Sequence, residues 1–134
     1  MRYRNEVRYI VKTILIVDDD PGVKHTIKYG LEGLDSNYQV ICADSGKQCF
    51  ELLEHKLVPD LILLDLMMPE MNGWEVQKKL RERMEWKTIP IVFLTSVEDP
   101  TSKKIGNITS EGFIEKPCRL PELKQKIDKI LQRK

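Results

Sequence analysis

Acidic, hydroxyl and amine side chains stand directly after several short apolar runs of this sequence, at points where strands are expected to end. In chain order they are Asp18, Asp19, Asp65, Thr95, Ser96 and Lys116. Carboxylates brought close together repel one another unless a cation neutralises them, and oxygen ligands with room for water suit Mg²⁺. With such a metal bound, a carboxylate can attack phosphorus to form an acyl phosphate, while an ammonium group stabilises the phosphoryl oxygens. These residue types therefore predict metal-dependent phosphoryl chemistry.

Asp65 is the predicted nucleophile of this set. It stands alone after its apolar run, whereas Asp18 and Asp19 are adjacent and better suited to holding a metal. Each residue also has a simpler interpretation, because an aspartate at a strand end often starts a turn, Thr95 can cap a helix and Lys116 can be a surface charge. We favour the chemical interpretation because capping does not require all of these residues together at successive strand ends.

The elements that must position these side chains follow from the pattern of apolar residues. From residue 13 onward, short β-branched runs alternate with helical patterns, which is typical of a parallel sheet covered by helices on both faces. The predicted strands are residues 13–17, 38–43, 61–64, 89–94 and 112–115. Ligands of such sheets bind at the carboxyl ends of the strands, so the polar residues are expected to converge on one crevice.

Caps and apolar spacing predict the helices. Asp20 is the expected N-cap of a helix over residues 21–34, and Ser45 with Gln48 has the spacing of a capping box that opens a second helix. Residues 97–111 have poor helix propensity and predict only a short helix. Two more helices are marked by apolar residues at helical spacing, which are Trp74, Val76 and Leu80 in one and Leu123, Ile127, Ile130 and Leu131 in the other.

Composition excludes several classes of protein. We expect one domain from 134 residues, and a net charge of +1 argues against the extended basic surface of a nucleic-acid-binding protein. The apolar runs are far shorter than the roughly 20 residues of a membrane helix. Residues 1–12 lack the apolar core of a signal peptide, so a cytoplasmic location is expected. The cysteines, which form no CxxC pair, are expected to be reduced thiols; they are Cys42, Cys49 and Cys118.

Four motifs in order make residues 13–134 resemble the receiver domain of two-component response regulators, in particular a stand-alone regulator of the chemotaxis type. The motifs are ILIVDDDP at 14–21, PDLILLDLMMPEMNG at 59–73, FLTS at 93–96 and GFIEKP at 112–117. The resemblance implies a flavodoxin-like, doubly wound α/β fold. Its five parallel strands are expected in the order 2-1-3-4-5 with helices on both faces, preceded by an N-terminal extension at residues 1–12.

The resemblance also implies a Mg²⁺ site. Asp65 matches the phosphoacceptor and, together with Asp19, matches the direct metal ligands. Asp18 matches the acidic neighbour that reaches the metal through water. Met67 matches the position whose backbone carbonyl completes the protein ligands.

Three further residues match parts of the family's switch. Thr95 matches the hydroxyl that moves to bind a phosphoryl oxygen, and Lys116 matches the lysine that pairs with another. Phe113 matches the aromatic residue that turns inward when that hydroxyl moves. The resemblance implies a cis bond between Lys116 and Pro117, while Cys118 stands where a phenylalanine is common.

The function implied is that of a phosphoacceptor signalling switch, with a histidine kinase or a phosphotransfer protein as the donor. The domain is expected to catalyse only its own phosphorylation and dephosphorylation, and so not to be an enzyme acting on a separate substrate. It is expected to signal by contacts with an unidentified downstream protein, as a monomer or weak homodimer, without touching nucleic acid or membrane.

Other functions fit the sequence less well. A phosphohydrolase of the haloacid dehalogenase type needs a DxDx[TV] motif, but Gly22 stands at its last position after Asp18. A calcium-binding EF-hand needs spaced acids and a glycine that residues 18–21 do not provide. A receiver-like binding module that is never phosphorylated usually lacks the acidic pair, the acceptor or the lysine, whereas this sequence retains all of them.

Overall fold

Five parallel strands form one sheet in the order β2-β1-β3-β4-β5 in the computed structural model, which describes residues 11–96, 112–117 and 119–132. Their bounds are β1 Lys12–Val17, β2 Tyr38–Ala43, β3 Leu61–Asp65, β4 Ile91–Thr95 and β5 Gly112–Glu115. In the registers, Leu15 of β1 lies beside Ile41 of β2 and Ile62 of β3. The predicted flavodoxin-like fold and its strand order are confirmed.

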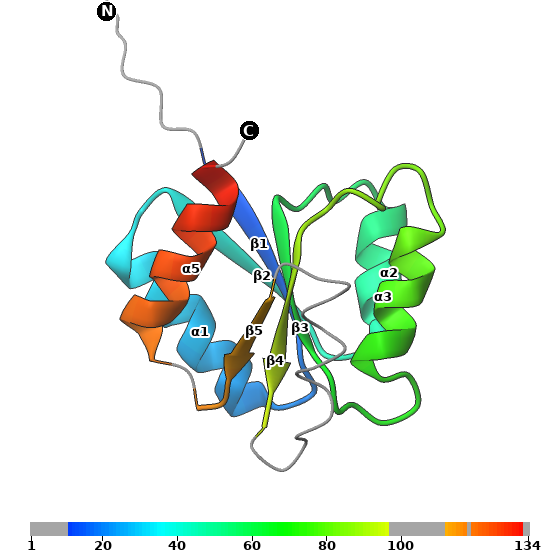
Figure 1. Cartoon of the computed structure of the whole chain (residues 1–134), viewed down its shortest axis with the longest axis horizontal. Helices are drawn as coiled ribbons and strands as arrows, with labels where there is room; N and C mark the ends of the chain where they lie inside the picture. Colours follow the sequence, from blue (N-terminus) through cyan, green and yellow to red (C-terminus); the bar gives the residue numbers. More distant parts are fainter. Residues whose placement is uncertain (1–10, 97–111, 118, 133–134) are drawn as a thin grey trace, which may run out of the picture.

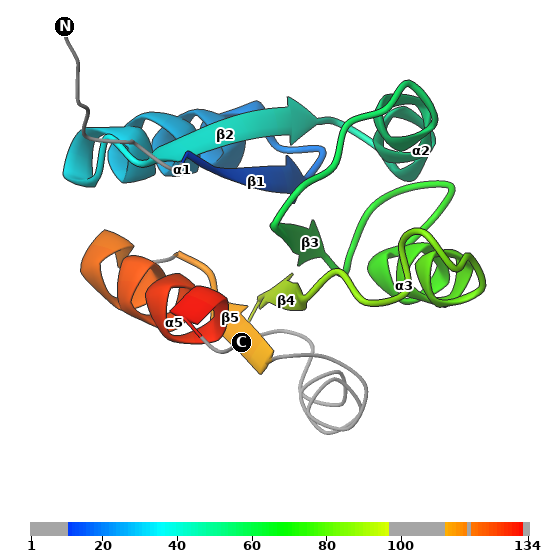
Figure 2. The same ribbon diagram turned by 90° about the horizontal axis from the view of Figure 1, so that it is seen from above.

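Helices cover both faces of this sheet. Their bounds are α1 Pro21–Leu34, α2 Gly46–Glu54, α3 Gly73–Arg81 and α5 Leu120–Gln132. Helices α1 and α5 lie on one face, and α2 and α3 lie on the other (Figures 1 and 2). Within the described ranges, no helix is long and apolar enough to span a bilayer. The short helix predicted over residues 97–111 lies outside the described residues.

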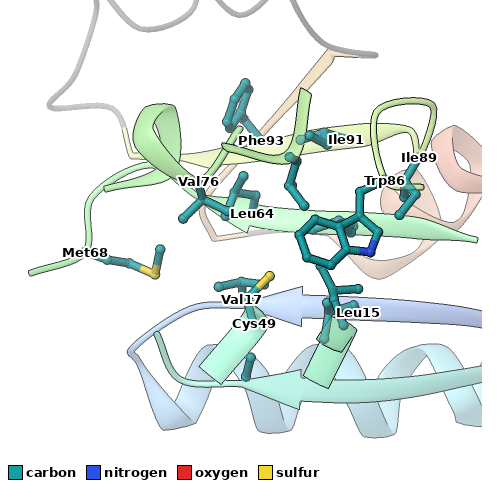
Figure 3. Packing of buried hydrophobic residues seen from close by; sticks show 14 of the residues in the cluster. Leu15, Val17, Cys49, Leu64, Met68, Val76, Trp86, Ile89, Ile91 and Phe93 are labelled. Carbon is teal, nitrogen blue, oxygen red and sulfur yellow. The ribbon is translucent and has the colours of Figure 1, made fainter. Parts of the chain in front are cut away.

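The sheet is buried on both faces, which explains why its central strands are apolar without interruption. Successive residues of a strand point to opposite faces. Leu15 and Val17 of β1 therefore join the core under α2 and α3, while Ile14 and Ile16 join the core under α1 and α5. All four are fully buried. Figure 3 shows the first of these cores, in which Phe93 of β4 lies beside residues of β3 and α3.

Helix caps follow the predictions in part. The Asp20 carboxylate accepts hydrogen bonds from the backbone N–H groups of Gly22 and Val23, at 2.8 and 3.4 Å, as expected of an N-cap. The capping box predicted at α2 is only half formed. The Ser45 hydroxyl accepts from the Gln48 N–H at 3.0 Å, but the Gln48 side chain accepts from the N–H of residue 44 instead of the N-cap residue.

Four strand limits differ from the prediction, the first being that β1 begins one residue earlier than predicted, at Lys12. Strand β4 begins at Ile91 rather than at residue 89, because the N–H of Ile89 is bonded to Trp86 O in the preceding turn at 3.1 Å and residue 90 is a proline without an N–H. Strands β3 and β4 also include Asp65 and Thr95 as their last residues. These two side chains are therefore held by the sheet itself rather than by the loops that follow it.

The outer edge of β2 is tied to α1 by two charged side chains. Lys28 Nζ donates to the Val40 carbonyl at 2.8 Å, and the Glu32 carboxylate accepts from the Val40 N–H at 2.8 Å. Lys28 and Glu32 also pair with each other at 3.1 Å. This contact with the strand lowers the pKa of Glu32. We call this pair of contacts, made by Lys28 and Glu32, the clamp on β2; it provides hydrogen-bond partners for both backbone groups of Val40.

We predict that Lys56→Gly stabilises the protein by about 0.5–1 kcal/mol, because Lys56 ends α2 in the left-handed region at φ 79°. Its N–H bonds Leu53 O at 3.1 Å, so the turn is held whatever the side chain is. Urea unfolding measures the change. The matched control is Lys78→Gly, at an exposed position within α3, which should destabilise by about 1 kcal/mol. Equal losses in both variants would contradict the prediction.

Candidate functional site

Three predicted carboxylates meet at the carboxyl ends of β1 and β3. Asp18 and Asp19 follow β1 directly, and Asp65 is the last residue of β3. One carboxylate oxygen of each residue lies within 4.8 Å of the other two. Asp18 is fully buried and Asp65 is 4% exposed, whereas Asp19 is open to solvent. The cluster therefore has a dry inner side and an accessible outer side.

Lys116 reaches the same cluster from β5. Its Nζ lies 2.8 Å from Asp18 Oδ2 and 3.2 Å from Asp65 Oδ1. Its backbone N–H donates to the Thr95 carbonyl at 2.8 Å, which fixes the end of β5 against the end of β4. The bond between Lys116 and Pro117 is cis, as expected.

The charges of this cluster are unbalanced. Burial raises the pKa of the Asp65 carboxyl to about 6 and the charge of Asp18 adds to this effect, while Lys116 opposes it. Burial by itself lowers the pKa of the Lys116 ammonium, but its bonds to Asp18 and its attraction to Asp65 outweigh burial and raise that pKa. Three carboxylates thus face one ammonium group among the described residues.

A divalent cation fits this arrangement. Asp18 Oδ2 is buried, and its partner among the described residues is the Lys116 ammonium group at 2.8 Å. An exposed third carboxylate leaves room for water, and the donor atoms are all hard oxygens. Mg²⁺ prefers such ligands and retains part of its water shell. The donor set therefore suits Mg²⁺.

The backbone of Met67 lies beside the Asp65 carboxylate, because its N–H donates to Asp65 Oδ1 at 3.3 Å. Its side chain points away from the interior and is 59% exposed. Metal binding by the backbone carbonyl of Met67 stays a prediction.

Gly73 holds this backbone in place, and the sequence analysis gave it no role. Its N–H donates to the Leu66 carbonyl at 3.0 Å, so the first residue of α3 packs directly on the chain that follows Asp65. A Cβ at position 73 would lie 2.5 Å from the Asp65 carbonyl oxygen. The helix begins with a reciprocal capping box, in which the side chain and N–H of Asn72 bond the N–H and side chain of Glu75. In the sequence, the Asn-Gly pair directly before the helically spaced apolar residues of α3 is the signal that could have indicated this role of Gly73.

The predicted switch residues lie on β4 and β5. Thr95 is 1% exposed and follows Leu94, the residue that pairs with Asp65 in the sheet register. Phe113 is half-buried and pairs with Phe93, with their ring centroids 5.8 Å apart. Cys118 lies outside the described residues.

A groove of about 310 Å³ opens beside the carboxylates. Asp20 and Thr26 belong to its α1 side, and Lys116 and Pro117 form its other side. A larger groove of about 620 Å³ lies between α2 and α3, and none of the three carboxylates lines it. None of the three carboxylates lines the smaller groove either, but it is lined by Lys116, the residue whose ammonium group pairs with Asp18 and Asp65.

Comparisons with known proteins agree with this geometry. The family model described as the response regulator receiver domain matches residues 14–128. Response regulator Rre1 of Synechocystis is 32% identical over 90% of this chain and 52% of its own length. A Vibrio cholerae protein named "Probable cyclic di-GMP phosphodiesterase" is 37% identical over 91% of this chain and 27% of its own length. The chain thus spans about half or less of these two relatives.

A solved structure shares the whole architecture. The signal receiver domain of a histidine kinase from Syntrophus aciditrophicus superposes with a TM-score of 0.79 at 30% identity. The superposition covers 92% of this chain and 95% of that chain.

Without metal, Asp65→Asn is predicted to raise the free energy of unfolding at pH 7 by about 1–2 kcal/mol. Folding raises the Asp65 pKa from its ordinary 3.8 to about 6, so the folded wild type holds this proton more tightly than the unfolded chain. Wild-type stability should therefore fall as pH rises from about 4 to about 6, and the variant should lack this fall. Denaturant unfolding in a chelator across this range measures both. The control is Asp44→Asn on the exposed surface, which should behave as wild type; an unchanged slope in Asp65→Asn would refute the prediction.

Gly73→Ala is predicted to destabilise the protein by about 1–3 kcal/mol, because the added methyl group meets the Asp65 carbonyl. It should also weaken Mg²⁺ binding, since the backbone beside the carboxylates must shift. Thermal unfolding and metal titration measure the two effects. Gly33→Ala in α1, where an added Cβ meets nothing within 4 Å, is the matched control and should stabilise by about 0.5 kcal/mol. Wild-type metal binding in Gly73→Ala would argue against this role.

Proposed function

This chain belongs to the response regulator receiver domain family, and from that premise we propose that Asp65 is the phosphoacceptor of a Mg²⁺-dependent signalling switch. Receiver domains of this family act in two-component signalling, in which they interact with histidine kinases or phosphotransfer proteins. The observation that carries the proposal is the position of Asp65, nearly buried beside two other carboxylates and paired with Lys116 at 3.2 Å.

The proposed reaction is a transfer of phosphorus from nitrogen to oxygen. A carboxylate oxygen of Asp65 attacks the phosphorus of a phosphohistidine on the partner; a P–O bond forms, the P–N bond breaks, and the imidazole nitrogen leaves with the electron pair. A pKa of about 6 leaves Asp65 mostly ionised, and so nucleophilic, at neutral pH. Asp18, Asp19, Asp65 and the Met67 carbonyl would hold Mg²⁺, which neutralises charge on the phosphoryl oxygens.

Lys116 and Thr95 would then stabilise the acyl phosphate. The Lys116 ammonium already lies 3.2 Å from Asp65, so it can pair with a phosphoryl oxygen after a small movement. Thr95 is the last residue of β4, the strand that pairs with β3, and follows Leu94, the register partner of Asp65; we assign its hydroxyl to another phosphoryl oxygen. The added negative charge acts as the signal. The Lys116 ammonium and the Thr95 hydroxyl have other partners before phosphorylation and must move to bind the phosphoryl oxygens.

The groove between α1 and Pro117 suits the approach of the donor. It is open, lies beside Lys116, and its wall carries the apolar side chains of Val23 and Ile27. We propose that a histidine kinase or phosphotransfer protein docks here with its phosphohistidine toward Asp65. Residues 13–134 would form the receiver domain, with residues 1–12 as an extension.

Incubation with acetyl phosphate and Mg²⁺ is expected to add one phosphoryl group to the wild-type chain, measured by intact mass. Asp65→Asn should gain none, and a chelator should prevent the gain, because nucleophile and metal are both required. Asp20→Asn is the matched control, since asparagine caps α1 as well as aspartate and the carboxylate cluster is unchanged. A phosphoryl group on Asp65→Asn, or equal labelling with and without Mg²⁺, would overturn the proposed function.

A further inference from the structure

Trp74 connects the backbone beside Asp65 to the core under α3. It directly follows Gly73, whose N–H is bonded to the Leu66 carbonyl. The Trp74 ring packs on Phe93 of β4, with ring centroids 4.7 Å apart and an angle of 56° between the planes. The position of the Trp74 ring is therefore tied to the chain that carries Asp65.

Phe93 extends this contact to β5. Its ring lies between those of Trp74 and Phe113, at 4.7 and 5.8 Å from their centroids, and is fully buried. A fully buried ring in a close-packed core transmits a displacement because it has no free space to absorb one. The three aromatic side chains thus form a continuous row from α3 to the predicted switch residue.

The first turn of α3 is stiff enough to move as one unit. The reciprocal capping box joins Asn72 to Glu75 through bonds of 3.0 and 2.9 Å. At Gly73 this turn packs so closely on the Asp65 carbonyl that a Cβ would lie 2.5 Å from the carbonyl oxygen. A shift of the backbone after Asp65 must therefore displace the start of α3, and Trp74 with it.

Trp74 lies at the edge of the core under α3. Val76 and Leu80 of the same helix are fully buried and fill the space above the sheet, whereas Trp74 is only partly buried at the edge of that cluster. Its large ring extends the contact of α3 to Phe93 and leaves part of its surface in solvent.

We infer that Trp74 is a positioning residue that couples the backbone of Asp65 to the side chain of Phe113, by a route that does not pass through Thr95. The inference rests on the proposed function, because the shift that Trp74 transmits is the one caused by a phosphoryl group on Asp65. The start of α3 would then change together with β5 when the domain is phosphorylated.

Beryllofluoride with Mg²⁺, a stable mimic of a phosphoryl group on a carboxylate, is the probe. The chain has two tryptophans, so Trp86→Phe leaves Trp74 as the only indole. Its emission should change on addition of beryllofluoride, with the concentration dependence that calorimetry gives for binding. In the matched variant Trp74→Phe, the remaining Trp86 has Arg83 over its ring at 4.2 Å and its ring contact is with Phe50, so its emission should stay constant.

A double-mutant cycle tests the coupling itself. Phe113→Leu should change the beryllofluoride affinity about fivefold or more when Trp74 is present, and much less in a Trp74→Leu background. A ring that only packs would give equal changes in both backgrounds, and this result with a silent Trp74 emission would overturn the inference. If Trp74→Leu does not fold, Trp74→Phe replaces it in the cycle, because it retains a smaller ring.

The calorimetric control separates the two proposals. One outcome is that the wild-type protein binds beryllofluoride and Mg²⁺, but the Trp74 emission does not change and the double-mutant cycle is additive. This outcome would refute the coupling and leave the proposed function intact. Wild-type protein that binds no beryllofluoride would refute the proposed function, and the coupling with it.

Discussion

The ends of the strands hold two carboxylates out of water beside the ammonium group of Lys116, and the rest of the site is built around this constraint. Asp18 and Asp65 lose most of their hydration, and Lys116 can balance only part of their charge. Charges in such a place are stable only if the surrounding backbone holds their partners in position. The sheet provides this support, since Asp65 ends β3, Asp18 follows β1 and Lys116 is bonded through its backbone to the end of β4. The same strand pairing that forms the sheet therefore also sets the positions of the charged groups in the site.

This uneven balance of charge is connected to two different parts of the fold. A bound cation or a phosphoryl group would change the net charge of the site, and the charged side chains affected by this change belong to different strands. Asp65 and Gly73 join this charge balance to α3, while Lys116 joins it to β5. Under the proposed function, a phosphoryl group on Asp65 would therefore act on α3 and on β5 at the same time.

Much of this could be predicted from the sequence, because the relevant signals are local. Uninterrupted apolar runs predicted the buried parallel strands. The polar residues after them predicted that Asp18, Asp19, Asp65 and Lys116 would meet. Two features were missed for physical reasons. The need for Gly73 arises from a close approach between α3 and the Asp65 carbonyl, which are brought together only by the fold. The limits of β4 depend on the turn that holds Ile89, which apolar pattern alone does not reveal. The functional roles of all the predicted site residues stay predictions: Asp18, Asp19, Asp65, Met67, Thr95, Phe113 and Lys116.

The clamp on β2 has a consequence for how this domain can associate. An exposed edge strand is a template on which another chain can add a strand, because its backbone groups lack partners. Here both backbone groups of Val40 are occupied by Lys28 and Glu32 of the same molecule. Extension of the sheet past β2 would require breaking two charged hydrogen bonds. At the β2 edge, this contact thus protects the sheet from the addition of a strand of another chain, whereas the opposite edge is formed by β5.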